Sequence, residues 1–249
     1  MEFKSGPIKF SVGAKPRNPE ADRATLIAIQ SLLERGDSVG AMTRSQAALA
    51  DGLAHPMLFH LAAEKLQSED RFPEALVLLE RGHAMDPDDL DLVQALGLCL
   101  FRLQKYQAAL PHFDVLLAAE PDFGPGHAAR GATLDALGDH PGAEAAYREA
   151  LKYQPDNLLA VAGLASLASR AGRHGEARAL AAQVLQVQPG YPEAEIVLAK
   201  ADLAEGALIE ADRRLKALLA DPRTGPEQKA FAEKLLADIP TSAGRTPDA

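Results

Sequence analysis

A repeat of 34 residues runs through most of this 249-residue chain. Four prolines mark it, at Pro87, Pro121, Pro155 and Pro189. Six alanines keep the same interval, at Ala41, Ala75, Ala109, Ala143, Ala177 and Ala211. The position five residues before each alanine is occupied by Gly36, Asp70, Gln104, Gly138, Gly172 and Gly206. A fixed period of about 20–50 residues is the signature of an array of equal structural elements stacked on one another.

The residues within one repeat predict a pair of antiparallel helices. The first helix has an apolar stripe and one small residue that lets its partner approach, at Ala63, Gly97, Gly131, Ala165 and Ala199. The glycine position ends this helix, because glycine accepts the left-handed conformation that a helix end often needs. Pro73 and Pro141 suit the first turn of the second helix, which ends before the next proline.

This pattern resembles the tetratricopeptide repeat. The repeat from Leu90 to Phe123 matches the family positions with Val93, Leu96, Gly97, Leu100, Tyr106, Ala109, Phe113 and Pro121. The next one matches with Gly131, Leu134, Gly138, Ala143, Tyr147, Ala150 and Pro155. The resemblance covers residues 20 to about 223. It implies an all-α fold, a right-handed superhelical solenoid of about six antiparallel helix hairpins plus a C-terminal helix.

The terminal repeats depart from the family pattern. The first has Thr25, Ile29 and Ser45 where aromatic or small residues are usual, and the sixth has Glu195 and Asp202 where apolar residues are usual. End repeats of an array are often atypical, because one of their faces meets solvent.

The sequence predicts three segments. Residues 1–19 are expected to form a flexible basic arm, residues 20–225 the array of six repeats, and residues 226–249 a C-terminal helix. The last of these leaves two alternatives open. Gly244 to Ala249 repeats the spacing of the earlier turns, which favours a partial seventh repeat in a longer protein, whereas Pro240 favours a capping helix followed by a tail.

Composition excludes several classes of function. The formal net charge is −9 and aromatic residues make up 5% of the chain, which argues against nucleic acid as a partner. Cys99 is the single cysteine, so no intrachain disulfide can form. No apolar stretch approaches the roughly 18 residues that span a membrane. We therefore expect a cytoplasmic protein without membrane insertion, and the resemblance implies a tetratricopeptide repeat protein of the bacterial type.

The sequence contains no recognisable catalytic site. The seven histidines form no paired metal-binding motif, and there is neither a glycine-rich phosphate loop nor a nucleophile elbow. His140 and His174 occupy equivalent turns one repeat apart and are expected to face solvent. We expect no enzyme activity, no cofactor and no metal site.

The resemblance places a partner on the first helices, which line the concave surface in this family. The expected partner-binding residues are Gln94, Leu98, Phe101, Arg102, Ala128, Ala132, Asp135, Ala162, Ser166 and Arg170. The Lys/Asn carboxylate clamp of the chaperone-binding members is absent from these positions. The small apolar floor either accepts bulky side chains of a partner, with Arg102 and Arg170 pairing with its acidic groups, or only tightens the superhelix.

The leading hypothesis is a non-catalytic scaffold that binds a peptide or helix of a partner protein in the concave groove. The alternative is the substrate-recruiting arm of a larger bacterial modifying enzyme, a sulfotransferase, glycosyltransferase or oxygenase, truncated at residue 249. Self-association through the terminal repeats is a third hypothesis.

Overall fold

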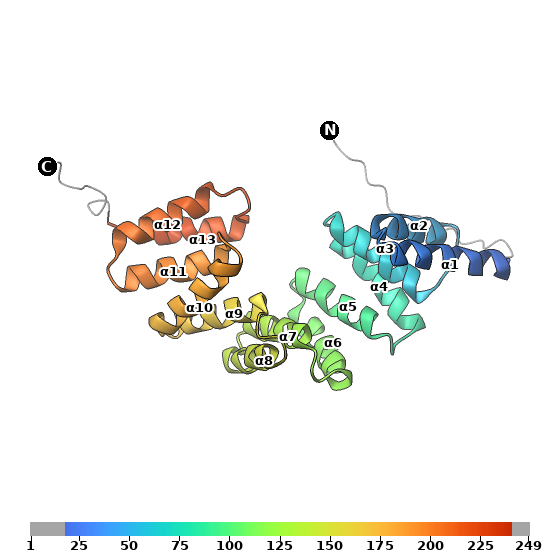
Figure 1. Cartoon of the computed structure of the whole chain (residues 1–249), viewed down its shortest axis with the longest axis horizontal. Helices are drawn as coiled ribbons and strands as arrows, with labels where there is room; N and C mark the ends of the chain where they lie inside the picture. Colours follow the sequence, from blue (N-terminus) through green and yellow to red (C-terminus); the bar gives the residue numbers. More distant parts are fainter. Residues whose placement is uncertain (1–17, 241–249) are drawn as a thin grey trace. The chain divides into compact units, whose positions relative to one another are not determined.

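The computed structural model describes residues 18–240, which form thirteen helices and no strands (Figure 1). The first helices of successive hairpins are α1 (Pro19–Glu34), α3 (Pro56–Ser68), α5 (Leu90–Arg102), α7 (Gly124–Ala136), α9 (Leu158–Arg170), α11 (Pro192–Ala204) and α13 (Pro226–Ala237). The second helices are α2 (Ser38–Ala50), α4 (Phe72–Met85), α6 (Tyr106–Ala119), α8 (His140–Tyr153), α10 (His174–Val187) and α12 (Leu208–Ala220). The prediction of an all-α fold is confirmed.

The 34-residue period of the sequence is also the period of the helices. From α3 onward every first helix begins 34 residues after the one before it, and the second helices keep the same interval from α2 to α12. α1 begins at Pro19 with the Asn18 side chain as its cap, so the array starts one residue before the predicted boundary. The rest of the predicted basic arm, and the Gly244–Ala249 segment, lie outside the described residues.

One left-handed residue makes the turn within every hairpin. Its φ is positive at each of the six equivalent positions, Gly36, Asp70, Gln104, Gly138, Gly172 and Gly206. Asp70 and Gln104 both adopt a φ of 58°, in a region where side chains other than glycine are strained. The geometry of the hairpin therefore requires a positive φ at this position in all six turns. Only four of the six have glycine, the residue that adopts this φ without strain.

The chain divides into two compact units between Pro121 and Asp122. Unit 1 contains α1 to α6, and unit 2 contains α7 to α13. In both units each second helix packs against the first helix of its own hairpin. First helices of neighbouring hairpins also contact each other, α3 with α5 in unit 1, and α7, α9, α11 and α13 in succession in unit 2.

Close approach of the two helices in a hairpin depends on the small residue of the first helix. A Cβ atom on Gly97 would lie 2.8 Å from the ring of Phe113 on α6. The ring of Tyr147 on α8 lies between two glycines, since a Cβ on Gly131 would be 2.8 Å away and one on Gly163 2.3 Å away. The aromatic residues of the second helices therefore fill space that the first helices leave empty.

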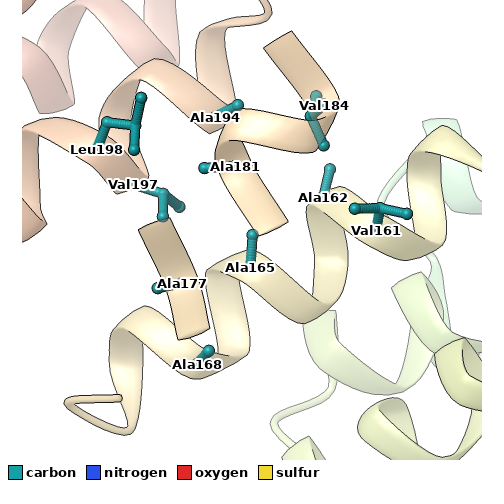
Figure 2. Close-up of a cluster of buried hydrophobic side chains, with 10 residues drawn as sticks. All are labelled: Val161, Ala162, Ala165, Ala168, Ala177, Ala181, Val184, Ala194, Val197 and Leu198. Atoms are coloured by element: carbon teal, nitrogen blue, oxygen red, sulfur yellow. The ribbon is translucent and has the colours of Figure 1, made fainter. Parts of the chain in front are cut away.

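Small side chains also form the core of unit 2 around α9, α10 and α11. Figure 2 shows ten buried residues of these three helices, among which alanine and valine predominate. Ala165 on α9 and Ala181 on α10 are fully buried, so the two backbones approach closely.

Ser45 on α2 of unit 1 occupies a position that is usually aromatic in the family pattern. It is buried, and its hydroxyl donates a hydrogen bond to the carbonyl oxygen of Ala41 at 2.9 Å.

Candidate partner-binding surface

The four predicted residues of unit 1 lie on α5 and differ in how far they reach solvent. Leu98 is 40% exposed, and Gln94 is partly buried. The Phe101 ring packs edge-on against Tyr106, with ring centroids 5.3 Å apart. The Arg102 guanidinium lies 5.0 Å from the centre of the Phe72 ring, where a cation–π contact holds it.

The six predicted residues of unit 2 lie on α7 and α9 at two depths. Ala128 is 1% exposed and Ala162 is 6% exposed, so a partner cannot contact their side chains without moving the helices. Ala162 belongs to the buried cluster formed by α9, α10 and α11. Ala132 and Ser166 are partly exposed. The accessible part of this surface is therefore smaller than the sequence predicted.

Asp135 on α7 and Arg170 on α9 form a bidentate ion pair. Nη1 of Arg170 donates to Oδ1 of Asp135 at 2.6 Å, and Nη2 donates to Oδ2 at 2.9 Å. Nη2 also donates to the Ser166 hydroxyl at 3.3 Å, and Nδ1 of His140 lies 3.0 Å from Asp135 Oδ1. This geometry joins two neighbouring first helices. Arg170, which was expected to pair with acidic groups of a partner, already has a carboxylate partner within the chain.

Two lysines on the same surface were missed by sequence reasoning. Leu98, Ala132 and Ser166 are 34 residues apart, and the same interval continues to Lys200 on α11 and Lys234 on α13. Extending the predicted positions beyond the fifth repeat would have found both. α9 contacts α11 and α11 contacts α13, so the equivalent positions follow one another across neighbouring helices.

The two lysines are cations without an ion-pair partner among residues 18–240. Lys200 is partly buried and Lys234 is exposed. Burial lowers the pKa of Lys200, and the positive charge of Arg170 lowers it further. Phe231 precedes Lys234 by three residues on α13, which places the two on one face of the helix. Its ring is 40% exposed.

Glu195 and Asp202, the acidic residues that stand at usually apolar positions of the sixth repeat, belong to an internal ion-pair network. Asp202 is 2% exposed, forms an ion pair with Arg178 on α10 and accepts a hydrogen bond from Arg214 on α12. The donor–acceptor distances are 2.8 and 2.9 Å. Nη1 of Arg214 also lies 3.1 Å from Oε2 of Glu195. These residues hold three consecutive helices together and are not directed at a partner.

A pocket of about 380 Å³ in unit 1 was not predicted. Most of its lining comes from α2, including Thr43 and Leu49, with Ala62 of α3 and Leu78 of α4. Arg71 at the start of α4 also lines it and is held by Glu74, to which its Nε donates at 2.7 Å. The pocket is formed mainly by second helices and is separate from the predicted surface on α5.

Two observations concern the chemically reactive side chains of the described residues. No group of three or more histidine, cysteine, aspartate or glutamate side chains between residues 18 and 240 is arranged to hold a metal ion. Burial raises the pKa of the Cys99 thiol to about 11, so it is protonated and weakly nucleophilic at neutral pH. None of the helices in this part of the chain combines the length and the apolar character that crossing a membrane would require.

Solved structures share this architecture. TTC0263 from Thermus thermophilus, a thermophilic tetratricopeptide repeat protein, is 20% identical with a TM-score of 0.60, and the match covers 73% of this chain and 99% of that one. PilW is 19% identical with a TM-score of 0.67, covering 86% and 99%. PilF from Pseudomonas aeruginosa is 15% identical with a TM-score of 0.65, covering 86% and 98%. At these identities the likeness establishes the fold.

Comparison of the sequence itself identifies the family. No curated protein matches the chain. One family model described as tetratricopeptide repeat matches residues 66–132 and 168–235, and a second with the same description matches residues 129–195. The first alone covers more than half of the 249 residues. With the helical period, the left-handed turns and the small-residue contacts described above, these matches show that the chain belongs to the tetratricopeptide repeat family.

Proposed function

We propose that this chain is a non-catalytic protein-interaction scaffold, and that the exposed face of its first helices binds a segment of a partner protein. Repeat arrays of this kind present extended surfaces on which a partner chain can lie. PilW is described as a widely conserved type IV pilus biogenesis factor. That description belongs to PilW, and a likeness of fold does not carry its role to this chain.

The observation that carries the proposal is the composition of the accessible first-helix positions. Ala132 and Ser166 are small and partly exposed, while the buried Ala128 and Ala162 lie beneath the same face. Small side chains leave room for larger ones from a partner. Leu159, seven residues before Ser166 on α9, is 44% exposed and adds an apolar contact.

Unit 1 presents a comparable feature in Leu98 on α5. An exposed leucine gains free energy when a partner covers it, because apolar surface is removed from water. The cation–π contact holds Arg102 beside the Phe72 ring without neutralising its charge, so the arginine can still attract an acidic group. We therefore assign Leu98 and Arg102 of unit 1 and Ala132, Leu159 and Ser166 of unit 2 as contact residues.

The test is a peptide-display selection against the whole chain, followed by binding measurements on four single variants. Leu98→Arg and Leu159→Arg place a long charged side chain on the first helices of unit 1 and unit 2. Val115→Arg on α6 and Val187→Arg on α10 are matched controls, because these valines are exposed on second helices, at 52% and 69%.

We expect each selected peptide to lose at least about tenfold in affinity with one of the two first-helix variants and to bind both controls normally. Loss of one well-packed apolar contact is sufficient for an effect of this size. Peptides that respond only to Val115→Arg or Val187→Arg would place the binding site on the second helices, and the proposal would be wrong. Peptides that compete for the pocket between α2 and α4 would have the same consequence.

A further inference from the structure

The first helices at the C-terminal end of unit 2 carry two lysines that have no ion-pair partner among the described residues. The protein as a whole has a formal net charge of −9. Lys200 and Lys234 nevertheless occupy equivalent positions on the neighbouring helices α11 and α13, and neither has an ion-pair partner among the described residues. Most other cations of α9 to α12 have such a partner, as Arg170, Arg178, Arg214 and Lys216 do.

An unpaired, partly buried ammonium group is costly, because burial removes water without supplying a counter-charge. Lys200 is in this situation. Its pKa is lowered, first by burial and then by the charge of Arg170. A carboxylate placed beside Lys200 would offset both contributions. The neighbouring pair of Asp135 and Arg170 cannot do so, since that carboxylate already accepts two hydrogen bonds from the arginine.

We propose that Lys200 and Lys234 bind the carboxylates of an acidic segment of a partner protein, with Phe231 contacting an apolar residue of the same segment. The proposal rests on the protein-binding function proposed above and specifies the class of partner. Neighbouring packed helices lie about 8–10 Å apart. A chain in the polyproline II conformation has three residues per turn and advances about 3.1 Å per residue, so acidic side chains three residues apart lie on one face and match this spacing.

The charge of the two lysines also favours an acidic segment over a neutral or basic one. The chain as a whole repels an acidic segment, and the two unpaired lysines supply a local attraction that offsets this repulsion. Asp238 lies four residues after Lys234 on α13 without pairing with it among residues 18–240, which leaves Lys234 available. The interaction is expected to weaken as salt concentration rises, because both lysines are reached by solvent ions.

The probe is a fluorescein-labelled peptide of about 15 residues with glutamate at every third position and leucine between them, a spacing that places the glutamates on one face of a polyproline II chain. A second peptide carries glutamine in place of every glutamate. Fluorescence anisotropy measures the affinity of the whole chain and of the Lys200→Gln and Lys234→Gln variants. Lys216→Gln is the matched control, since Lys216 is exposed on α12 and pairs with Asp212 at 2.8 Å. Thermal unfolding confirms that each variant folds.

We expect the glutamate peptide to bind the wild type and Lys216→Gln equally, and each of the other variants at least about tenfold more weakly. The glutamine peptide should bind the wild type as weakly as the glutamate peptide binds a variant that combines Lys200→Gln with Lys234→Gln. Undetectable binding to the wild type, or equal affinity for all variants, would overturn the proposal. A single-stranded oligonucleotide of equal charge that binds more tightly than the peptide, in a lysine-dependent way, would overturn it in favour of a phosphate ligand.

The outcome is separable from that of the proposed function. If display-selected peptides lose affinity with Leu159→Arg but contain no acidic residues and ignore both lysine substitutions, the first-helix face is the binding surface and the acidic partner class is wrong. If they ignore Leu98→Arg and Leu159→Arg as well, the proposed function fails with it.

Discussion

At single positions, the fold imposes a left-handed backbone conformation even on a turn residue that is not glycine. Gln104 has a φ of 58° at a place where four of the six turns have glycine. The left-handed conformation costs a residue with a Cβ atom about 1–2 kcal/mol. Within residues 18–240 the Gln104 side chain makes no hydrogen bond that would offset this cost. The packing of α5 against α6 therefore supplies the energy that keeps this turn in place.

The first prediction follows from that strain. Gln104→Gly should raise the free energy of unfolding by about 0.5–1 kcal/mol, since it removes the steric cost and adds a smaller loss of chain entropy. Gly138→Ala, which introduces the strain at the equivalent turn between α7 and α8, should lower it by a similar amount. Chemical denaturation of the three proteins checks both signs, and a destabilised Gln104→Gly variant would contradict the argument.

At the level of elements, α13 begins where the 34-residue period places a first helix. It lacks two features that the first helices of the complete hairpins share. The position that packs against the second helix is buried in all six complete hairpins, at Ile29, Ala63, Gly97, Gly131, Ala165 and Ala199. In α13 it is the exposed Glu233. The left-handed turn position is Pro240, whose ring prevents a positive φ. We propose that α13 caps the array, because it lacks these two features of a first helix that receives a second helix.

The second prediction tests this inference with tryptophan, which the chain otherwise lacks. Glu233→Trp should change stability by less than about 0.5 kcal/mol and give fluorescence that solvent quenchers reach, because Glu233 is exposed within residues 18–240. Ala199→Trp should cost more than about 3 kcal/mol, since Ala199 is fully buried against Leu215 and Leu218. A shielded fluorophore at position 233 would show instead that residues after 240 pack on α13.

At the level of the whole molecule, the sequence predicted the helical hairpins well, and the reason is the period. Each repeat carries its own turn, its own small residue and its own apolar stripe, so local patterns are sufficient to locate the helices. The division between Pro121 and Asp122 had no such signal, because the interval of 34 residues continues across it unchanged. Compactness depends on contacts between helices, which a local pattern does not encode.

The candidate site was less predictable for a related reason. The period identified positions such as Ala132 and Ser166, but it did not show that Ala128 is buried. Nor did it show that Arg170 is bound to Asp135, a residue 35 positions away on the next first helix. Side-chain pairing between helices depends on their separation and tilt. Lys200 and Lys234 continue the 34-residue interval from Ser166 and could have been predicted from it. They were missed because the predicted surface ended at the fifth repeat.

The division into two units leads to the last prediction, which concerns Asp202. Replacing this buried carboxylate by alanine leaves Arg178 and Arg214 without their shared partner, at a cost of about 2–4 kcal/mol. Hydrogen exchange should then accelerate in α10, α11 and α12 while the amides of unit 1 keep their wild-type rates. Asp212→Ala removes only an exposed pair with Lys216 and should cost less than about 0.5 kcal/mol. If Asp202→Ala accelerates exchange equally in α3 to α6, the two units unfold together, and the 34-residue period specifies one cooperative structure.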